Sequence, residues 1–277
     1  MSHPALVPGR VAVVTGAASG IGLASARRFK ALGLIVLLAD LPGEALDAAL
    51  ADLGDGAHAQ ATDVSDPAAL IALKDRAYAL GEVAVLMNNA GAARGGKPWE
   101  NPDAWRRVLE TNLYGAVNGM QAFVPEMLAR GLPGAVICTG SKQGVTTPPG
   151  DAAYNASKAA LKVVAEQAAF ELHKAGAAIT AHLLVPGATF TGMTARGAAE
   201  KPAYAWSADQ VAEQLIEGLN AGDFYIWCED NETSREMDER RIQWAADDLI
   251  RNRPALSRWR PEFADEFSAW MAGVRRP

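Results

Sequence analysis

The stretch "VAVVTGAASGIG" (11–22) is the part of the 277-residue sequence that decides the fold. Five apolar or β-branched residues lead directly into a glycine-rich turn, and the turn opens a helix-like segment at 20–32. Backbone N–H groups at the start of a helix, exposed by glycines after a strand, form a binding site for phosphate. We therefore expect a dinucleotide-binding strand–turn–helix unit here, although a glycine-rich turn alone is weak support.

The three glycines of this turn have separate expected roles. Gly16 would form the tight turn, Gly20 would let the backbone approach a pyrophosphate, and Gly22 would let the helix pack closely on the sheet. Their spacing is G-x3-G-x-G rather than the G-x-G-x-x-G of long dehydrogenases.

Six further short runs resemble strands, and most are continuously apolar. They occupy residues 34–40, 57–64, 83–91, 134–141, 179–187 and 224–228. Continuous apolar strands are typical of a parallel sheet covered on both faces. Helix-like stretches lie between them, for example 152–175 and 207–219, the latter opened by the N-cap residue Ser207. This alternation predicts one α/β domain over residues 1–277, a doubly wound parallel sheet of about seven strands.

Composition excludes several classes of protein. The formal net charge of -6 argues against a nucleic-acid partner, and no stretch approaches the roughly 18 apolar residues of a membrane helix. The first ten residues lack the pattern of a signal peptide, and Cys138 and Cys228 make no disulfide framework. The four histidines show no ligand spacing. We expect a cytoplasmic protein without a metal site or a membrane partner.

Asp40 ends the second predicted strand, 18 residues after Gly22. A carboxylate there can accept hydrogen bonds from both hydroxyls of an adenosine ribose, and it would repel a 2′-phosphate. The neighbouring residues 37–44 contain no Arg or Lys, and Ser19 in the turn is also uncharged. NAD is therefore favoured over NADP. Alternatively, Asp40 only forms the turn before Pro42.

The segment "YNASK" (154–158) contains a candidate catalytic pair. Tyr154 and Lys158 are four residues apart, so on a helix they lie on one face and can share a pocket. Such a pair also occurs by chance in many helices.

Together, these motifs resemble those of the short-chain dehydrogenase/reductase family, of the single-domain NAD(P)-binding type with a Rossmann fold. The resemblance covers about residues 8–228. In chain order the motifs are "TGAASGIG" at 15–22, Asp40, "DV" at 63–64, "NNAG" at 88–91, Asn112, Ser141, Tyr154 with Lys158, "PG" at 186–187, and Thr191.

The resemblance implies an NAD-dependent oxidoreductase that interconverts a secondary alcohol and a ketone by hydride transfer. Tyr154 would be the base, and Lys158 with the positive nicotinamide ring would lower its pKa from about 10. Lys158 would also hold the nicotinamide ribose, and Ser141 would bind the substrate oxygen. Asn112 would hold a water that links the lysine to solvent, or would mark a helix kink.

Other positions carry over as cofactor contacts. Asp63 and Val64 would contact the adenine, unless Asp63 only forms the turn before Pro67, while Asn89 would steady its strand and Thr191 would bind the carboxamide. The complete predicted cofactor set is Gly16, Ser19, Gly20, Ile21, Gly22, Asp40, Asp63, Val64, Asn89, Ala90, Gly91, Tyr154, Lys158, Pro186, Gly187, Thr189 and Thr191.

The sequence departs from the family around the substrate. Gly140 stands where many relatives have a second serine, and Lys142 and Gln143 in the unusual loop 141–151 would face either the substrate or solvent. Residues 188–206 occupy the position of the family's mobile lid. The predicted substrate residues are Lys142, Gln143, Phe190, Met193 and Trp206.

A C-terminal extension at about 229–277 follows the core. "TSRE" (233–236) fits a capping box that opens a charged helix, which Pro254 stops. A second helix would place Phe263, Phe267, Trp270 and Met271 on one face, and that face has to be buried. The family resemblance implies a homodimer or homotetramer, and we expect residues 254–277 to cross a subunit boundary or to close over the pocket rim. Alternatively, they fold back on their own subunit.

Two other functions are considered. A non-catalytic regulator that binds a dinucleotide usually lacks the Tyr or the Lys, and both are present here. A sugar-nucleotide epimerase or dehydratase shares YxxxK, but such chains are generally longer and carry TGxxGxxG. The identity of the small-molecule alcohol or ketone is not predicted.

Overall fold

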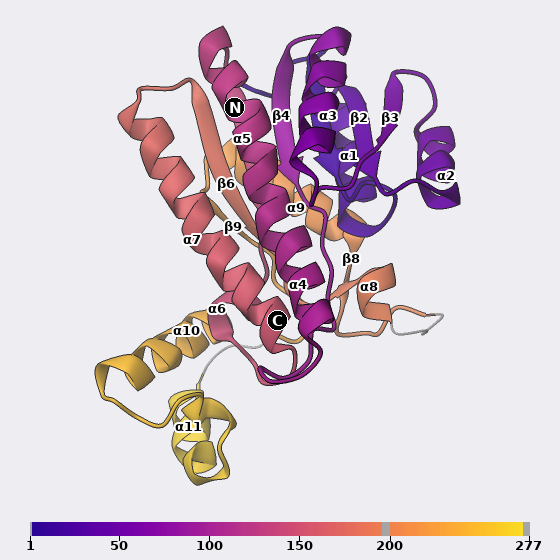
Figure 1. Ribbon diagram of the computed structural model, residues 1–277. Coiled ribbons are helices and arrows are strands. Elements are labelled where there is room, and N and C mark those ends of the chain that lie inside the picture. The colour runs from indigo at the N-terminus through magenta and orange to yellow at the C-terminus, as the bar shows by residue number, and fades with distance from the viewer. Residues whose placement is uncertain (1, 196–199, 274–277) are drawn as a thin grey trace.

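The computed structural model describes residues 2–195 and 200–273. Its main sheet has seven strands in the order β3-β2-β1-β4-β5-β6-β9, and every pair is parallel (Figure 1). The strands are β1 (Val11–Thr15), β2 (Ile35–Asp40), β3 (Ala57–Ala61), β4 (Val83–Asn88), β5 (Gly134–Thr139), β6 (Ile179–Val185) and β9 (Tyr225–Trp227). The predicted doubly wound α/β sheet is confirmed.

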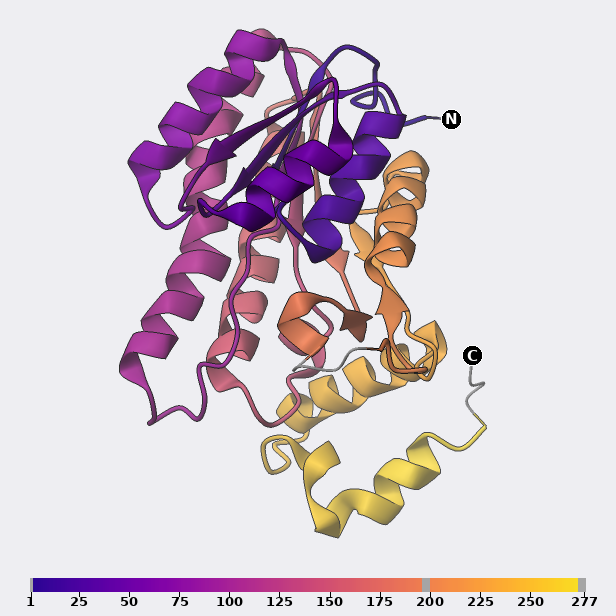
Figure 2. The same ribbon diagram turned by 90° about the vertical axis from the view of Figure 1, so that its right-hand side faces the viewer.

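Helices cover both faces of the sheet (Figures 1 and 2). One face carries α1 (Gly20–Ala31), α2 (Glu44–Leu53) and α9 (Ala208–Ala221), and the other carries α3 (Pro67–Leu80), α5 (Gly115–Arg130) and α7 (Ala152–Lys174). Side chains alternate between the faces, so Val14 packs with Phe29 of α1 while Val13 packs with Phe123 of α5. Burial on both sides explains why the strands are continuously apolar.

Several shorter elements lie between the main strands and helices. They are α4 (Pro102–Leu109), the π-helix η1 (Glu110–Tyr114), α6 (Gln143–Thr146), α8 (Gly192–Ala195) and a small parallel pair of β7 (Thr189–Phe190) with β8 (Trp206–Ser207). Ser207 caps α9 as predicted, in a capping box with Gln210. Among the described residues, no helix has the length and apolar content needed to cross a membrane.

The predicted strands run too far at their carboxyl ends. β4 ends at Asn88, β5 at Thr139 and β6 at Val185, two or three residues before the predicted ends at 91, 141 and 187. The residues beyond these ends are the loops at the carboxyl edge of the sheet. β1 has β2 on one side and β4 on the other, so the chain order reverses there and a crevice opens between the loops.

Hydrogen bonds through two buried histidines, His3 and His182, hold the N-terminal segment against β6. His3 Nδ1 accepts from the Ala5 N–H (3.2 Å), so in the neutral ring Nε2 donates to Thr180 Oγ1 (3.1 Å). Thr180 Oγ1 donates to His182 Nε2 (2.7 Å), and His182 Nδ1 donates to the Asp223 carbonyl (2.7 Å). Protonation of His3 would turn Nδ1 from an acceptor into a donor that faces the Ala5 N–H. Protonation of His182 would turn Nε2 into a donor toward Thr180 Oγ1, whose own proton can then go to the Gly134 carbonyl (3.3 Å).

Low pH is expected to destabilise the folded protein through these two histidines. Burial is the main cause that lowers the pKa of His3 and of His182 from the ordinary value of 6.5. The unfolded chain then binds these protons at a higher pH than the folded chain does, so the free energy of unfolding should decrease as the pH falls below 6.5. Denaturant titrations at several pH values measure this slope. His182→Gln should flatten the slope and the exposed His173→Gln should not; equal slopes for all three proteins would contradict the prediction.

The C-terminal extension forms α10 (Arg235–Ile250), the 3₁₀ turns η2 (Ser257–Trp259) and η3 (Pro261–Phe263), and α11 (Ala264–Trp270). The N-cap of α10 is Ser234, one residue after the predicted Thr233, and its hydroxyl accepts from the Met237 N–H (3.3 Å). Residues 274–277 of the predicted tail and 196–199 of the predicted lid lie outside the described residues.

The apolar face of the tail folds back on its own chain. Phe267 and Trp270 pack against Trp244 of α10, with ring centroids 5.2 and 6.2 Å apart. Figure 1 shows α11 beyond α10, on the side away from the sheet. The expectation that this face closes over the pocket rim is wrong for the described tail residues, because Trp244 supplies the apolar partner that the face needs.

Candidate active site

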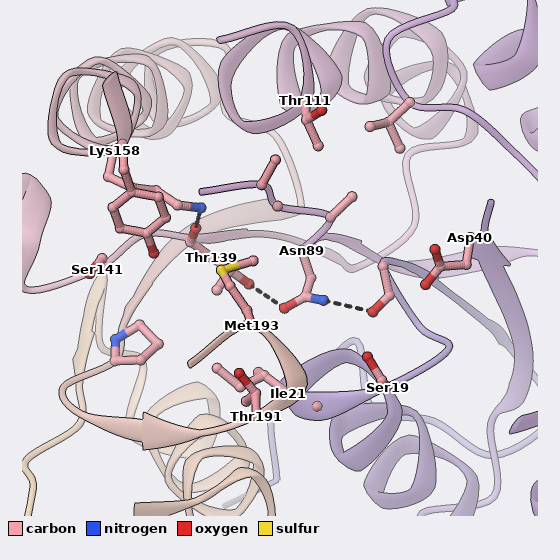
Figure 3. Close-up of a pocket in the computed structure, with 18 of the residues that line it drawn as sticks. Ser19, Ile21, Asp40, Asn89, Thr111, Thr139, Ser141, Lys158, Thr191 and Met193 are labelled. Atoms are coloured by element: carbon pink, nitrogen blue, oxygen red, sulfur yellow. Dashed lines mark hydrogen bonds between the residues drawn. The ribbon is translucent and has the colours of Figure 1, made fainter. Parts of the chain in front are cut away.

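A cavity of about 580 Å³ opens at the carboxyl edge of the sheet (Figure 3). All the predicted cofactor residues except Gly22 line it, as do Ser141 and Met193. In Figure 3, Ser19 and Asp40 lie at one end of this cavity, while Ser141 and Lys158 lie at the other. One cavity thus joins the glycine turn to the candidate catalytic residues.

The glycine turn has the geometry that its sequence requires. Gly16 and Gly20 have backbone φ values of +64° and +55°, which residues other than glycine rarely adopt. A Cβ on Gly22 would lie 2.2 Å from the Gly16 carbonyl oxygen, so Gly22 allows α1 to pack on the turn rather than on the sheet as predicted. In the described structure no side chain caps the start of α1, and its first turn carries no acidic residue. Its N–H groups and helix dipole are therefore suited to an anion.

Asp40 connects the glycine turn to the end of β2. Its carboxylate accepts from the Ala18 N–H (2.8 Å) and from the Leu41 N–H (2.8 Å). Asp40 therefore does stabilise the local turn, as the alternative interpretation expected. Each carboxylate oxygen can still accept a second hydrogen bond, and Asp40 lines the cavity, so it remains available to a ligand.

Asn89 ties together three strand ends beneath the cavity. Its Nδ2 donates to the carbonyls of Thr15 (3.0 Å) and Gly16 (3.2 Å), while its Oδ1 accepts from Thr139 Oγ1 (3.1 Å). Because these bonds come from β1, β4 and β5, Asn89 fixes the spacing of the loops around the cavity.

At the adenine end predicted from the sequence, Asp63 and Val64 follow β3 and line the cavity. Asp63 Oδ1 accepts from the N–H (2.9 Å) and hydroxyl (2.7 Å) of Ser65, and Asp66, not Asp63, caps α3. Asp63 therefore forms a local turn as well as lining the cavity.

Tyr154 and Lys158 lie in the first turns of α7, whose N-cap is Asp151. Asp151 accepts from the N–H groups of Tyr154 (3.2 Å) and Gly95 (3.0 Å), so the start of the helix is fastened to the loop after β4. Lys158 Nζ donates to the Thr139 carbonyl (2.7 Å) and lies 5.7 Å from the centre of the Tyr154 ring. Tyr154 also shares a hydrogen bond with the Ser141 side chain.

The pKa of Tyr154 is shifted by its surroundings. Burial raises it above its ordinary value of 10, and the hydrogen bond with Ser141 only partly opposes this effect. Burial also lowers the pKa of Lys158 to about 8. Without NAD the pKa of Tyr154 is therefore raised rather than lowered, and Lys158 Nζ bonds to the Thr139 carbonyl. The predicted lowering by Lys158 together with the positive nicotinamide ring stays a prediction.

Asn112 lies behind the cavity rather than in its wall. Its side chain is only 1% exposed and forms bonds to Ala92, donating to the carbonyl (2.9 Å) and accepting from the N–H (2.6 Å). It also donates to Ser157 Oγ (2.9 Å) on α7. The π-helix η1 surrounds it, so Asn112 does mark an irregular turn between α4 and α5. Its link to a water stays a prediction.

Four of the five predicted substrate residues do not line the cavity. Gln143 is exposed, Phe190 belongs to the β7 strand, and Trp206 packs against the core beside α9. Lys142 is buried and pairs with Asp238 and Asp230 of the extension, so it faces neither substrate nor solvent. Only Met193 lines the cavity.

Several lining residues were not predicted. They are Leu41, Thr62, Ser65, Ala92, Arg107, Glu110, Thr111, Thr139, Gly140 and Thr194. Thr139 and Gly140 follow from the rule that ligands bind at the carboxyl ends of parallel strands. Arg107 and Thr111 are four residues apart on a helix that leads to Asn112, and that spacing is the signal that could have placed both on one face.

Comparison with known proteins identifies the chain. The short chain dehydrogenase family matches residues 10–202. The chain belongs to this family. It is 38% identical over 247 residues to 1-deoxy-11-beta-hydroxypentalenate dehydrogenase of Streptomyces exfoliatus, covering 85% of this chain and 88% of the relative. It is 39% identical over 190 residues to galactitol 2-dehydrogenase (L-tagatose-forming) of Cereibacter sphaeroides, covering 67% and 74%.

Similarity to solved structures supports the same family. A short chain dehydrogenase/reductase from Burkholderia phymatum in complex with NAD superimposes with a TM-score of 0.80 at 29% identity, covering 89% of this chain and 96% of that one. As a member of the family, this chain is an oxidoreductase that acts on alcohol groups with a nicotinamide dinucleotide. The family, fold and reaction class predicted from the sequence are confirmed.

Proposed function

We propose that this short-chain dehydrogenase interconverts a secondary alcohol and its ketone with NAD, through Tyr154, Lys158 and Ser141. The observation that carries the proposal is that these three side chains meet at one end of the cavity whose other end is formed by the glycine turn and Asp40. A substrate oxygen placed beside Ser141 and Tyr154 would then face the cofactor along one continuous cavity.

The residues around the cavity fit a dinucleotide. The uncapped start of α1 suits a pyrophosphate, and a Cβ on Gly16 or Gly20 would lie 2.7 Å from Ala90 Cα or 3.1 Å from Thr191 Cγ2. Asp40 has acceptor positions for ribose hydroxyls, while Lys158 lies at the end proposed for the nicotinamide and Thr191 lies beside Ile21 and the glycine turn. When bound, NAD supplies the carbon that accepts the hydride.

Tyr154 is the group proposed to take the proton of the alcohol. Hydride leaves the carbinol carbon as its hydroxyl proton is removed, so a base has to contact that oxygen. Ser141 bonds to Tyr154 in the structure and would hold the substrate oxygen between the two hydroxyls. Lys158, with three donors, would bond to a ribose hydroxyl while it keeps its bond to Thr139.

The preference for NAD over NADP rests on Asp40. Both of its oxygens are fixed by backbone N–H groups, so the charge is held at the end of the cavity where the adenosine ribose would lie. A 2′-phosphate placed beside it would meet like charge. Arg107 also lines the cavity, and its positive charge would favour a phosphate group. The preference for NAD over NADP therefore has to be measured.

We expect the wild type to prefer NAD by at least about tenfold in kcat/KM, a difference of about 1.4 kcal/mol. Asp40→Ala with Leu41→Arg should move the preference toward NADP, because one change removes repulsion and the other supplies a phosphate partner. Initial rates with each cofactor measure this. Asp47→Ala with Ala48→Arg, at two exposed positions on the neighbouring helix α2, controls for the change of charge. Equal use of both cofactors by the wild type would show that Asp40 does not contact the ribose.

The substrate is best sought by a screen. The names of the relatives range from a hydroxypentalenate to a sugar alcohol, so secondary alcohols, hydroxy acids, polyols and steroids should be tested with NAD and followed by NADH absorbance. Turnover of any of them would exclude the non-catalytic regulator. NADH binding without turnover of any alcohol or ketone would favour it. The cytoplasmic location remains part of the proposal, since Cys138 and Cys228 are buried free thiols.

A homo-oligomer is also proposed, formed through α5 and α7. Val163 and Phe170 are 53% and 59% exposed and lie seven residues apart on α7, so they share one face of the helix. Phe170→Asp should lower the mass measured by light scattering. Leu249→Asp, at an 87% exposed apolar position on α10, should leave the mass unchanged. The opposite pattern would assign the interface to the extension.

A further inference from the structure

The C-terminal extension contacts the catalytic loop through a buried ionic cluster, defined here as Lys142, Asp230, Asp238 and Arg241. Lys142 Nζ lies 2.6 Å from Asp238 Oδ2 and 3.5 Å from Asp230 Oδ2. Arg241 Nη1 lies 3.3 Å from Asp238 Oδ1. Two cations and two carboxylates thus balance in charge. Asp238 is 1% exposed and Lys142 is 8% exposed, so solvent does little to screen the cluster.

The cluster forms hydrogen bonds beyond its ion pairs, although the buried Arg241 Nε has no hydrogen-bond partner among the described residues. Trp227 Nε1 donates to Asp238 Oδ2 (3.1 Å), and Arg241 also donates to Thr233 Oγ1 (3.3 Å). A buried charge that loses its partner is strongly unfavourable, because it has neither water nor an opposite charge. The side chain of Lys142 is therefore held by the C-terminal extension, through Asp238 of α10 and Asp230.

Lys142 transmits this position to Ser141, its chain neighbour. The Lys142 N–H donates to the Pro186 carbonyl (3.0 Å), and its own carbonyl accepts from the N–H groups of Val145 (3.0 Å) and Thr146 (2.8 Å) at the end of the short helix α6. The backbone of residues 141–142 is thus fixed on both sides. Ser141, the residue proposed to hold the substrate oxygen, has little freedom to move while these bonds persist.

The cluster also supports the neighbouring wall of the cavity, at residues 186–188. A Cβ on Gly187 would lie 2.9 Å from Lys142 Nζ and 2.9 Å from Asp230 Oδ2, so the ion pair packs directly on this backbone. Asp230 Oδ2 accepts from the Ala188 N–H (3.4 Å). Pro186 and Gly187 line the cavity next to Ser141. One group of charges therefore contacts two loops that would enclose the reacting atoms.

We infer that Lys142 and Asp238 are positioning residues for Ser141, and that the extension is in this way part of the active site. The inference rests on the proposed function of Ser141. Neither residue lines the cavity, and both act through the backbone of 141–142 and 186–188. Removing one charge should let Ser141 shift. Because a misplacement of about 1 Å can lower a rate about 100-fold, we expect kcat to fall by about 10- to 100-fold.

The test compares Asp238→Asn and Lys142→Met with a matched control, Glu239→Gln. Glu239 is the next residue of the same helix, but its bond to Arg235 (2.9 Å) is at the surface. For both cluster variants, kcat should fall while one NADH still binds per chain and the NADH Kd stays within about threefold. The deuterium isotope effect with a carbinol-deuterated alcohol should increase, because a shifted oxygen slows hydride transfer. Partial unfolding would lower the number of NADH sites without changing the isotope effect. Lys142→Arg should recover more activity than Lys142→Met.

Hydrogen exchange provides a readout that needs no substrate. Exchange of the N–H groups in 141–147 and 186–188 should accelerate in both cluster variants and not in Glu239→Gln. If the wild type has no turnover, the proposed function fails, while this exchange pattern still tests the link to the extension. If the wild type is active and both folded variants keep its kcat, isotope effect and exchange pattern, the inference is overturned. If Asp238→Asn does not fold, Lys142→Met decides the test alone.

Discussion

Tyr154→Phe is expected to lower turnover by about 10²- to 10⁴-fold, the usual effect of removing a general base. The hydroxyl is the part of Tyr154 that shares a hydrogen bond with Ser141, and phenylalanine keeps the ring and its packing. NADH affinity should change by less than about threefold, because the glycine turn, Asp40 and Lys158 are proposed to supply the cofactor contacts. Stopped-flow or steady-state rates, together with NADH fluorescence titration, measure both quantities.

Tyr225→Phe is the matched control for this experiment. Tyr225 lies in the edge strand β9 and is 46% exposed, and its hydroxyl bonds to Glu166 of α7. It does not line the cavity. It loses the same atom without touching the proposed site. Retention of more than about a tenth of wild-type turnover by Tyr154→Phe would show that another group takes the proton.

The local parts of this site could be predicted from the sequence. The glycine turn, Asp40 and the Tyr154–Lys158 pair each depend on residues that are close together in the chain and on elements whose periodicity is clear. The order of strands then brings their carboxyl ends to one edge. These local signals identify the two ends of the cavity wall, and the family resemblance supplies most of the other predicted residues of the wall.

The orientation of Lys142 could not be predicted in the same way. Its partner Asp238 lies on a helix near the other end of the chain, outside the region that resembles the family. A lysine beside a catalytic serine is compatible with a substrate contact, with solvent and with a buried ion pair. Only the tertiary structure distinguishes these possibilities, because long-range pairing leaves no periodic pattern in the sequence.

Trp244 shows the same limit for the C-terminal tail. The apolar face of Phe267 and Trp270 indicated that something must cover it, and this was correct. The covering residue lies in a helix that reads as mainly charged, where a single tryptophan gives no clear stripe. Trp244 is nevertheless 3% exposed, between the tail and Arg253, whose guanidinium lies 4.1 Å from its ring centre.

Gly22→Ala is expected to disrupt the glycine turn and cofactor binding together. The added Cβ would lie 2.2 Å from the Gly16 carbonyl oxygen and 2.6 Å from Asn89 Nδ2. Neither group can move freely, because Asn89 bonds to that carbonyl and to Thr139 of β5. Overpacking of this kind costs about 1 to 3 kcal/mol of stability, and contact with the backbone places it at the upper end.

Displacement of the turn should also weaken NADH binding by at least about tenfold, which corresponds to about 1.4 kcal/mol. Gly192→Ala is the control, because a Cβ at Gly192 would meet no atom within 4 Å and the residue has an ordinary φ. Thermal unfolding and fluorescence titration of both variants separate the two effects. Because Gly22 itself does not line the cavity, a loss of affinity can only arise through movement of Gly16, Asn89 and the start of α1. Wild-type melting and wild-type NADH affinity in Gly22→Ala would show that α1 can move away from the turn without loss, and that close packing at Gly22 does not shape the phosphate site.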